Sequence, residues 1–379
     1  MPINPTDFYE QLASHGVGFF TGVPDSLLKE FCLCIDNRIQ SGKHIITANE
    51  GNAVALAAGY YLANKTLPLV YMQNSGLGNA VNPLLSLCDT EVYSIPMMVM
   101  IGWRGEPAVK DEPQHVKQGK IQLELLETMD IPYVIISKDD KQFSSKISNA
   151  VEIARNESRP SVLLIKKGTF KKYGKEIQQE DNQRMLREEA LEVILENLEN
   201  DTILVSTTGK TSREIFEIRE KNSQGHEQDF LTVGSMGHCS SVALGIAIAK
   251  PSRKIVCIDG DGALIMHMGS LSIVGRLKPH NFFHILINNG VHESVGGQET
   301  SAKFIDISAL VKANGYQNVF FTDKQVELKS RINELFNRKG PNFLEVLVKP
   351  GSRENLGRPT IKPKDNKRIF MDFVQVEQD

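Results

Sequence analysis

Residues 254–262 read KIVCIDGDG, and residues 282–290 read FFHILINNG. Each segment begins as an apolar run rich in β-branched or aromatic residues, which predicts a buried strand, and each ends in glycine beside Asp or Asn. Residues 263–277 between them carry apolar side chains at helical spacing. Strand, helix and strand in this order predict a βαβ unit.

The two glycine-containing ends predict a ligand site. Parallel strands joined by a right-handed crossover end at the same edge of a sheet, so we expect Asp261 and Asn289 to lie side by side there. A carboxylate and an amide oxygen are ligands that suit Mg²⁺, and Gly260 and Gly262 allow the backbone to approach a ligand closely. The alternatives are two simple glycine turns, or a hairpin at Asn289-Gly290. No alternating strand follows Gly290, which argues against the hairpin.

The spacing of these residues resembles that of a known family. Gly260-Asp261-Gly262, the 25 residues from 263 to 287, and Asn288-Asn289 are similar to the fingerprint of enzymes that use thiamin diphosphate. The resemblance implies thiamin diphosphate and Mg²⁺ as cofactors. It also implies that Asp261, Asn289 and Val291 hold the metal, and that Gly260 and Gly262 lie against the cofactor.

The composition is that of an ordinary globular protein. Of the 379 residues, 41% are hydrophobic and 23% are charged, and the formal net charge is −3. This balance gives no reason to expect nucleic acid or an anionic membrane as a partner, and no apolar run has the length of a membrane span. The five cysteines form neither a disulfide framework nor a zinc signature, so we expect a cytoplasmic protein with reduced thiols.

The chain is long enough for two domains, and its pattern predicts two. Helices and strands alternate over residues 1–170 and again over residues 183–350, with a polar linker at 171–182 and a polar tail at 351–379. We therefore expect an α/β protein with two doubly wound parallel-sheet domains. The resemblance implies a pyrimidine-binding first domain and a diphosphate-binding second domain, without the third, central domain of many relatives.

Glu50 follows a predicted strand at 44–48 and begins a predicted helix. An acidic residue at a helix start is favoured by the helix dipole, which is the simpler explanation. Glu50-Gly51 also resembles the family's glutamate that hydrogen-bonds N1′ of the pyrimidine and activates the cofactor, which would make Glu50 both catalytic and cofactor-binding. Asn74 and Ser75, at the break after a predicted strand at 69–72, are further candidates for cofactor contact.

Two more turns are candidates for cofactor contact. Gly234-Ser235-Met236 resembles the family segment in which a backbone carbonyl accepts from the 4′-amine and a bulky apolar residue bends the cofactor. Gly234 would be the acceptor and Met236 the wedge, although a methionine here is also ordinary core packing. Thr208 and Gly209 begin the segment TGKTS at residues 208–212, which is similar to the last residues of a Walker A loop. The first glycine of that motif is missing, so we do not predict a Walker A loop. The amides and hydroxyls of this segment are candidates for diphosphate contact only.

Three further segments resemble one branch of the family. They are residues 21–26 (TGVPDS), 111–115 (DEPQH) and 288–298 (NNGVHESVGGQ), and they are similar to the phosphonopyruvate decarboxylase branch, with the sulfopyruvate decarboxylases as near relatives. The resemblance implies decarboxylation of 3-phosphonopyruvate to phosphonoacetaldehyde and CO₂ in phosphonate biosynthesis, by a homodimer or higher oligomer with each cofactor between subunits. A sulfopyruvate decarboxylase and a carboligase similar to acetolactate synthase stay open as alternatives.

Asp25 and His115, which lie in these segments, resemble the Asp and His that related decarboxylases use as proton relays. Asp25 is alternatively a helix cap, and His115 an exposed histidine in a long polar loop predicted at 102–119. The phosphonate of the substrate calls for cationic or hydroxyl donors. The candidates for this role are Arg104, Lys110, His292 and Ser294.

Overall fold

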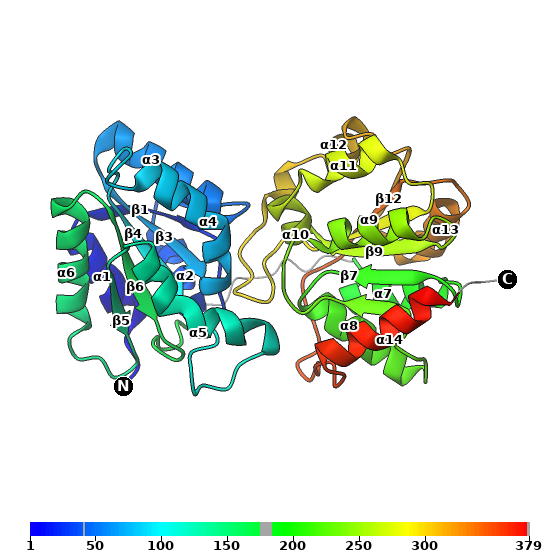
Figure 1. The fold of residues 1–379 in the computed structure, drawn as a ribbon, viewed down its shortest axis with the longest axis horizontal. Helices are drawn as coiled ribbons and strands as arrows, with labels where there is room; N and C mark the ends of the chain where they lie inside the picture. Colours follow the sequence, from blue (N-terminus) through cyan, green and yellow to red (C-terminus); the bar gives the residue numbers. More distant parts are fainter. Residues whose placement is uncertain (41, 175–183, 377–379) are drawn as a thin grey trace. The chain divides into compact units, whose positions relative to one another are not determined.

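The structure is a computed structural model that describes residues 1–40, 42–174 and 184–376. The chain divides into two units, Met1–Gln178 with Ser294–Gln298, and Gln179–Glu293 with Glu299–Asp379. Each unit contains one six-stranded sheet with helices on both faces, and the paired strands are parallel (Figure 1). The predicted class, α/β with two doubly wound parallel sheets, is confirmed.

In the first unit, helices and strands alternate along the chain. The strands are β1 (Val17–Gly22), β2 (His44–Ile46), β3 (Leu67–Gln73), β4 (Met97–Gly102), β5 (Tyr133–Ile136) and β6 (Pro160–Ile165). The helices are α1 (Pro5–Ser14), α2 (Lys29–Arg38), α3 (Glu50–Asn64), α4 (Leu77–Pro83), α5 (Pro113–Thr128) and α6 (Phe143–Asn156). The strand order β2-β1-β3-β4-β6-β5 reverses between β1 and β3, and open α/β sheets bind ligands at the carboxyl ends of strands at such a point.

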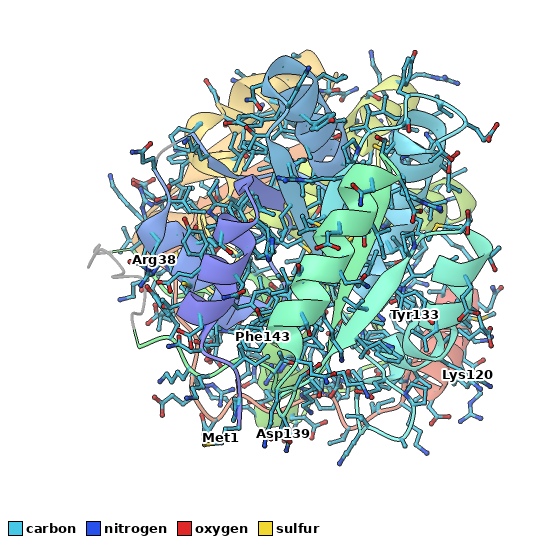
Figure 2. All side chains as sticks on the ribbon, turned by 90° about the vertical axis from the view of Figure 1, so that its left-hand side faces the viewer. Met1, Arg38, Lys120, Tyr133, Asp139 and Phe143 are labelled. Carbon is cyan, nitrogen blue, oxygen red and sulfur yellow. The ribbon has the colours of Figure 1, made fainter. Side chains whose placement is uncertain are left out.

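Helices cover both faces of this first sheet. Buried side chains of α1, α2 and α6 pack on one face, and those of α3, α4 and α5 pack on the other. Figure 2 shows α1 beside α6, where the ring of Phe8 stacks on Phe143 with centroids 6.1 Å apart. Local signals fix the start of α1, because Asn4 accepts from the N–H of Thr6 at 3.0 Å and Pro5 occupies the first helical position.

The second unit repeats the same topology. Its strands are β7 (Ile203–Ser206), β8 (Asp229–Leu231), β9 (Ile255–Gly260), β10 (Phe282–Asn288), β11 (Asn318–Thr322) and β12 (Asn342–Leu347). Its helices are α7 (Arg187–Glu196), α8 (Lys210–Lys221), α9 (Cys239–Ala249), α10 (Asp261–Met266), α11 (Ser270–Leu277), α12 (Ile307–Ala313), α13 (Gln325–Phe336) and α14 (Pro363–Gln375). Read from β8, the order β8-β7-β9-β10-β12-β11 matches that of the first sheet strand for strand.

Strands β9 and β10 are the predicted pair and lie in the middle of the second sheet. They run parallel, with Gly260 opposite Ile287, and every residue of β10 is buried, as its continuous apolar sequence predicts. Helices α7, α8 and α13 pack on one face, and α9 lies on the other (Figure 1). The single helix predicted over 263–277 is two helices, because His267 leaves helical geometry at φ −130° and ψ 45°.

Other segments also differ from the expected pattern. The polar loop expected at 102–119 ends earlier, because α5 begins at Pro113, whose fixed φ suits a helix start. The tail expected after residue 350 contains α14, whose Phe370 is buried. The expected linker at 171–182 falls mainly on residues 175–183, which lie outside the described residues. Within the ranges that the structure covers, no helix is both long and apolar enough to span a membrane.

Candidate active site

Glu50 is the first residue of α3, at the carboxyl edge of the first sheet. Asn49 caps this helix by accepting from the N–H of Asn52 at 2.9 Å. The Glu50 side chain is only 5% exposed, and its Oε2 accepts from Asn79 Nδ2 at 2.8 Å. Its Oε1 lies against Gly76, where a Cβ would come within 2.1 Å. The backbone position suits a dipole-favoured acid, but the side chain is held inside the unit at a defined place.

Asp25 lies in the turn after β1 and is fully buried. Its Oδ1 accepts from Gln73 Nε2 at 2.6 Å, and its Oδ2 accepts from the N–H of Leu27 at 3.0 Å. Burial raises the pKa of Asp25, and the hydrogen bond from Gln73 opposes that rise. The helix-cap alternative is wrong, because α2 begins at Lys29 and Leu28 is its N-cap residue.

Asn74 and Arg104 join the ends of the neighbouring strands β3 and β4. Asn74 Nδ2 donates to the carbonyl of Arg104 at 2.8 Å, and Asn74 Oδ1 accepts from the Arg104 N–H at 3.2 Å. The guanidinium of Arg104 forms a two-point ion pair with Asp111 and donates to Ser26 Oγ at 2.9 Å. Burial alone would raise the pKa of Asp111, but the hydrogen bonds from Arg104 and from the Gly105 N–H, together with the charge of Arg104, outweigh it and lower the pKa to about 2. Arg104 is therefore a fixed cation at this edge.

His115 lies in the first turn of α5 instead of an exposed loop, so the loop-histidine alternative is wrong. It is 8% exposed, and burial together with the charge of Arg104 lowers its pKa to about 4. Its Nδ1 has no hydrogen-bond partner among the described residues. Lys110 and Ser75 are exposed, and Ser75 Oγ donates to Gln73 Oε1 at 2.6 Å.

The second unit brings Asp261 and Asn289 together at the ends of the paired strands β9 and β10. Asp261 is 4% exposed, and its Oδ2 accepts from Thr300 Oγ1 at 2.5 Å. Burial raises the pKa of Asp261 to about 6, against the opposing hydrogen bond from Thr300. A nearby cation would stabilise such a buried carboxylate. A carboxylate with an amide oxygen beside it is a donor set that fits Mg²⁺.

Asn289 is held by the loop that follows β10. The chain turns at Gly290, which has a φ of +69°. Asn289 Oδ1 accepts from the N–H of Val291 at 3.1 Å, and its Nδ2 donates to Glu293 at 3.0 Å. The preceding Asn288 is buried, and its Oδ1 accepts from the Gly290 N–H at 3.0 Å. The hairpin alternative is wrong, because β10 is followed by a loop and α12.

The start of α8 offers a place for a phosphate group. Gly209 precedes this helix with a φ of +98°, and no atom lies within 4 Å of the position its Cβ would take. The first N–H groups of a helix have no partner within the helix and favour anions. Thr208 is half-buried in the same turn, and Gly260 lies on β9, the strand next to β7. This open turn fits a diphosphate.

Ser235, Met236 and His292 shape the space beside Gly262. Ser235 follows Gly234 and has a φ of +56°, a strained value for a residue other than glycine and one that is often found at functional sites. A Cβ on Gly262 would lie 3.4 Å from Met236 Cε and 3.1 Å from His292 Cε1. Burial lowers the pKa of His292 to about 4, so this imidazole is neutral near neutral pH.

The predicted residues fall into two sets. In the first unit they lie at or after the carboxyl ends of strands, and they are Asp25, Glu50, Asn74, Ser75, Arg104, Lys110 and His115. In the second unit they are Thr208, Gly209, Gly234, Ser235, Met236, Gly260, Asp261, Gly262, Asn289, Val291 and His292. Ser294 is exposed and belongs to the segment grouped with the first unit.

Sequence reasoning missed three residues that contact the predicted carboxylates. Asn79 of α4 donates to Glu50. Gln73 donates to Asp25, and its place at the end of β3 was a usable signal. Thr300 donates to Asp261 across 39 residues of sequence, and no local pattern indicates that contact.

The sequence models of two protein families, both from one enzyme class, match segments of the two units. The N-terminal TPP binding domain of thiamine pyrophosphate enzymes matches residues 6–126, and the C-terminal TPP binding domain of the same enzymes matches residues 207–346. The first match contains Asp25, Glu50 and His115, and the second contains Asp261 and Asn289.

Relatives of known name cover nearly the whole chain. The phosphonopyruvate decarboxylases of Streptomyces viridochromogenes and Streptomyces hygroscopicus are 33% and 32% identical, each over 98% of this chain and over 95% and 94% of their own length. The sulfopyruvate decarboxylase of Methanosarcina acetivorans is 28% identical over 99% of both chains. The chain therefore belongs to the phosphonopyruvate decarboxylase family of thiamine pyrophosphate enzymes.

Proposed function

We propose that this chain is a carboxy-lyase that uses thiamin diphosphate and Mg²⁺ to convert 3-phosphonopyruvate to phosphonoacetaldehyde and CO₂. The observation that carries the proposal is the similarity to phosphonopyruvate decarboxylases over 98% of the chain. A buried glutamate at the start of α3 and a buried aspartate at the end of β9 support it, because they resemble the activating glutamate and the fingerprint aspartate of the family. The aldehyde product would enter phosphonate biosynthesis.

The residues of each unit suit one end of the cofactor. When bound, thiamin diphosphate supplies a nucleophilic C2 carbon and an electron sink for the electron pair left by CO₂. Glu50 would hydrogen-bond the pyrimidine, and its contacts with Asn79 and Gly76 hold the carboxylate ready for that task. Asp261 and Asn289 would hold Mg²⁺, while the first N–H groups of α8 would bind the diphosphate.

Asp25 and His115 are the residues that we propose move protons to and from the substrate. Burial raises the pKa of Asp25 and lowers the pKa of His115 to about 4. Burial therefore favours the neutral form of both groups, in which Asp25 carries a proton to donate and His115 has a ring nitrogen to accept one. Arg104 lies near both groups, since its charge acts on the pKa of each.

Arg104 is the residue that we favour for binding the phosphonate. It is cationic, partly buried and fixed by Asp111, and a guanidinium has five N–H donors, so donors remain after the contacts with Asp111 and Ser26. His292 is neutral near neutral pH, because burial lowers its pKa to about 4, and it could supply only a neutral hydrogen bond. Lys110 is exposed, which makes it a weaker candidate.

We further propose that the chain acts as a homodimer or a larger homo-oligomer. The resemblance implies a cofactor bound between the pyrimidine-binding unit of one subunit and the diphosphate-binding unit of another. Six exposed hydrophobic residues support the proposal, because α3, which begins at Glu50, and α9 and α11 each expose two of them. They are Leu56, Leu62, Val242, Ile248, Ile273 and Leu277.

The proposed function is tested by measuring the conversion of the phosphonate substrate to its phosphonate product. The purified chain, loaded with thiamin diphosphate and Mg²⁺, is incubated with 3-phosphonopyruvate, and the products are followed by ³¹P NMR and CO₂ release. We expect phosphonoacetaldehyde and CO₂ in equal amounts, and no turnover once the cofactor is removed. Cofactor binding without any CO₂ release from 3-phosphonopyruvate would contradict the proposal.

A further inference from the structure

Glu293 is a buried carboxylate that the proposed function leaves without a role. It follows Asn289 by four residues, and its side chain is 9% exposed. It accepts hydrogen bonds from Arg187 Nη1 at 2.6 Å, from Lys210 Nζ at 2.9 Å and from Asn289 Nδ2 at 3.0 Å. Two cations and a proposed metal ligand therefore converge on one carboxylate.

The partners of Glu293 are themselves fixed by other elements. Arg187 begins α7, and its Nε and Nη2 donate to Glu214 of α8 at 2.6 and 2.8 Å. Glu214 is fully buried, and Lys210 is the first residue of the same helix. Moving the Glu293 carboxylate would leave the buried Arg187 with one carboxylate partner instead of two and would break the ion pair with the half-buried Lys210, which is costly. The carboxylate therefore presents a fixed acceptor to Asn289.

A fixed acceptor decides which way the Asn289 amide faces. A carboxylate only accepts hydrogen bonds, so the amide must turn its NH₂ group toward Glu293 and its oxygen away from it. That oxygen accepts from the N–H of Val291 at 3.1 Å. A carbonyl oxygen has a second lone pair, which leaves a site for a cation. The opposite orientation would turn the NH₂ group toward the cation and remove the ligand.

We infer that Glu293 is a positioning residue that orients the Asn289 amide so that its oxygen, and not its NH₂ group, faces the divalent cation. The inference rests on the proposed function, which assigns Asn289 to the metal. Outer partners of metal ligands commonly matter in this way, and their loss typically weakens metal affinity by about 10- to 100-fold.

The substitution Glu293→Met removes this constraint with little change of volume. Methionine offers no acceptor comparable to a carboxylate, so the Asn289 NH₂ group loses the partner that holds it. Both orientations of the Asn289 amide then become available, and only one of them presents the oxygen to the cation. Glutamine would not remove the constraint, because Arg187 Nη1 and Asn289 Nδ2 donate to the same Glu293 oxygen, Oε2, and a glutamine oxygen in that place keeps both hydrogen bonds.

The neighbouring residue supplies a matched control. Asn288 Nδ2 donates to Glu345 Oε1 at 2.8 Å, and Glu345 is 6% exposed. The pair of Asn288 and Glu345 is thus of the same kind as the pair of Asn289 and Glu293. Successive side chains of an extended chain point in opposite directions, so Asn288 points away from the side on which Asn289 lies. In Glu345→Gln the introduced oxygen keeps the hydrogen bond from Asn288, so cation binding should not change.

Binding of Mn²⁺ in the presence of thiamin diphosphate tests the inference without measuring activity. The electron paramagnetic resonance signal of free Mn²⁺ is measured for the wild type, Glu293→Met, Glu345→Gln and Asp261→Ala, and thermal unfolding of each chain without metal checks its fold. We expect the dissociation constant for Mn²⁺ to rise about 10-fold or more in Glu293→Met and less than about twofold in Glu345→Gln. Asp261→Ala should lose binding.

A second variant covers the case in which Glu293→Met does not fold. Glu293→Asp keeps the charge that pairs with Arg187 and Lys210 but is one methylene shorter, so the contact with Asn289 is lost and Mn²⁺ should again bind more weakly. Wild-type Mn²⁺ affinity in the folded Glu293 variants, or an equal loss in Glu345→Gln, overturns the inference while the proposed function stands. Failure of the wild type to bind Mn²⁺ with thiamin diphosphate overturns the proposed function instead.

Discussion

Substituting Gly76 by alanine displaces the Glu50 carboxylate without removing it. A Cβ at residue 76 would lie 2.1 Å from Glu50 Oε1 and 2.4 Å from its Cδ. Heavy atoms in ordinary contact are about 3.5 Å apart, so the carboxylate must withdraw by more than about 1 Å. The backbone itself accepts alanine, because Gly76 has a φ of −77°. The change therefore acts on the position of one carboxylate.

The displacement should slow activation of the cofactor. A misplacement of about 1 Å in a reacting group costs on the order of 100-fold in rate, which is about 2.7 kcal/mol in activation free energy. We expect Gly76→Ala to slow hydrogen–deuterium exchange at C2 of bound thiamin diphosphate by that factor. The diphosphate and metal residues lie in the other unit, so cofactor affinity should change much less.

The assay measures hydrogen–deuterium exchange at C2 by quenched flow and ¹H NMR, on protein to which thiamin diphosphate and Mg²⁺ are bound. Gly78→Ala is the matched control, because nothing lies within 4 Å of the Cβ that this substitution adds. Exchange in Gly76→Ala as fast as in Gly78→Ala, with the cofactor bound to both, would refute the assignment of Glu50 as the activating residue.

Three further predictions concern the metal, the assembly and the pH dependence of stability. Asp261→Ala should fold but no longer retain thiamin diphosphate with Mg²⁺, and normal binding in calorimetry would contradict the metal assignment. Inactive Glu50→Gln and Asp261→Ala chains should regain part of the activity when mixed, and no gain between chains that exchange would argue against sites shared by subunits. The folded pKa of His115 is about 4 because of burial and the charge of Arg104, whereas unfolded histidine titrates near about 6.5. The unfolded chain therefore binds more protons in this window, so stability should fall as the pH decreases from about 6.5 to about 4. His115→Gln should make that fall shallower in thermal unfolding scans, and an unchanged slope would disprove the burial argument.

The centre of each sheet was predictable because its sequence signals are local. The run that forms β9 and the run that forms β10 are apolar throughout and end at glycine, so the strands, their parallel pairing and the meeting of Asp261 with Asn289 all follow from short segments. The start of α3 at Glu50 follows in the same way from the capping residue Asn49.

The missed features depend on tertiary context. Strand β5 has only four residues and lies at the edge of its sheet, where half-buried side chains leave a weak pattern. The contact of Thr300 with Asp261 and the ion pair of Arg187 with Glu293 join residues that are 39 and 106 positions apart. No periodic pattern spans such distances, so only the folded chain shows which partners hold the metal ligands.

The most direct test of the account compares three 2-keto acids that differ at one end. A phosphonate can carry two negative charges where a sulfonate carries one and a methyl group none, so a pocket with a fixed cation such as Arg104 should prefer the phosphonate. Polar groups left without a partner should also penalise pyruvate. We predict a kcat/KM for 3-phosphonopyruvate at least about 100-fold above that for sulfopyruvate or pyruvate, or roughly 2.7 kcal/mol in transition-state binding. A higher kcat/KM for sulfopyruvate, or consumption of pyruvate together with a second keto acid, would contradict this account.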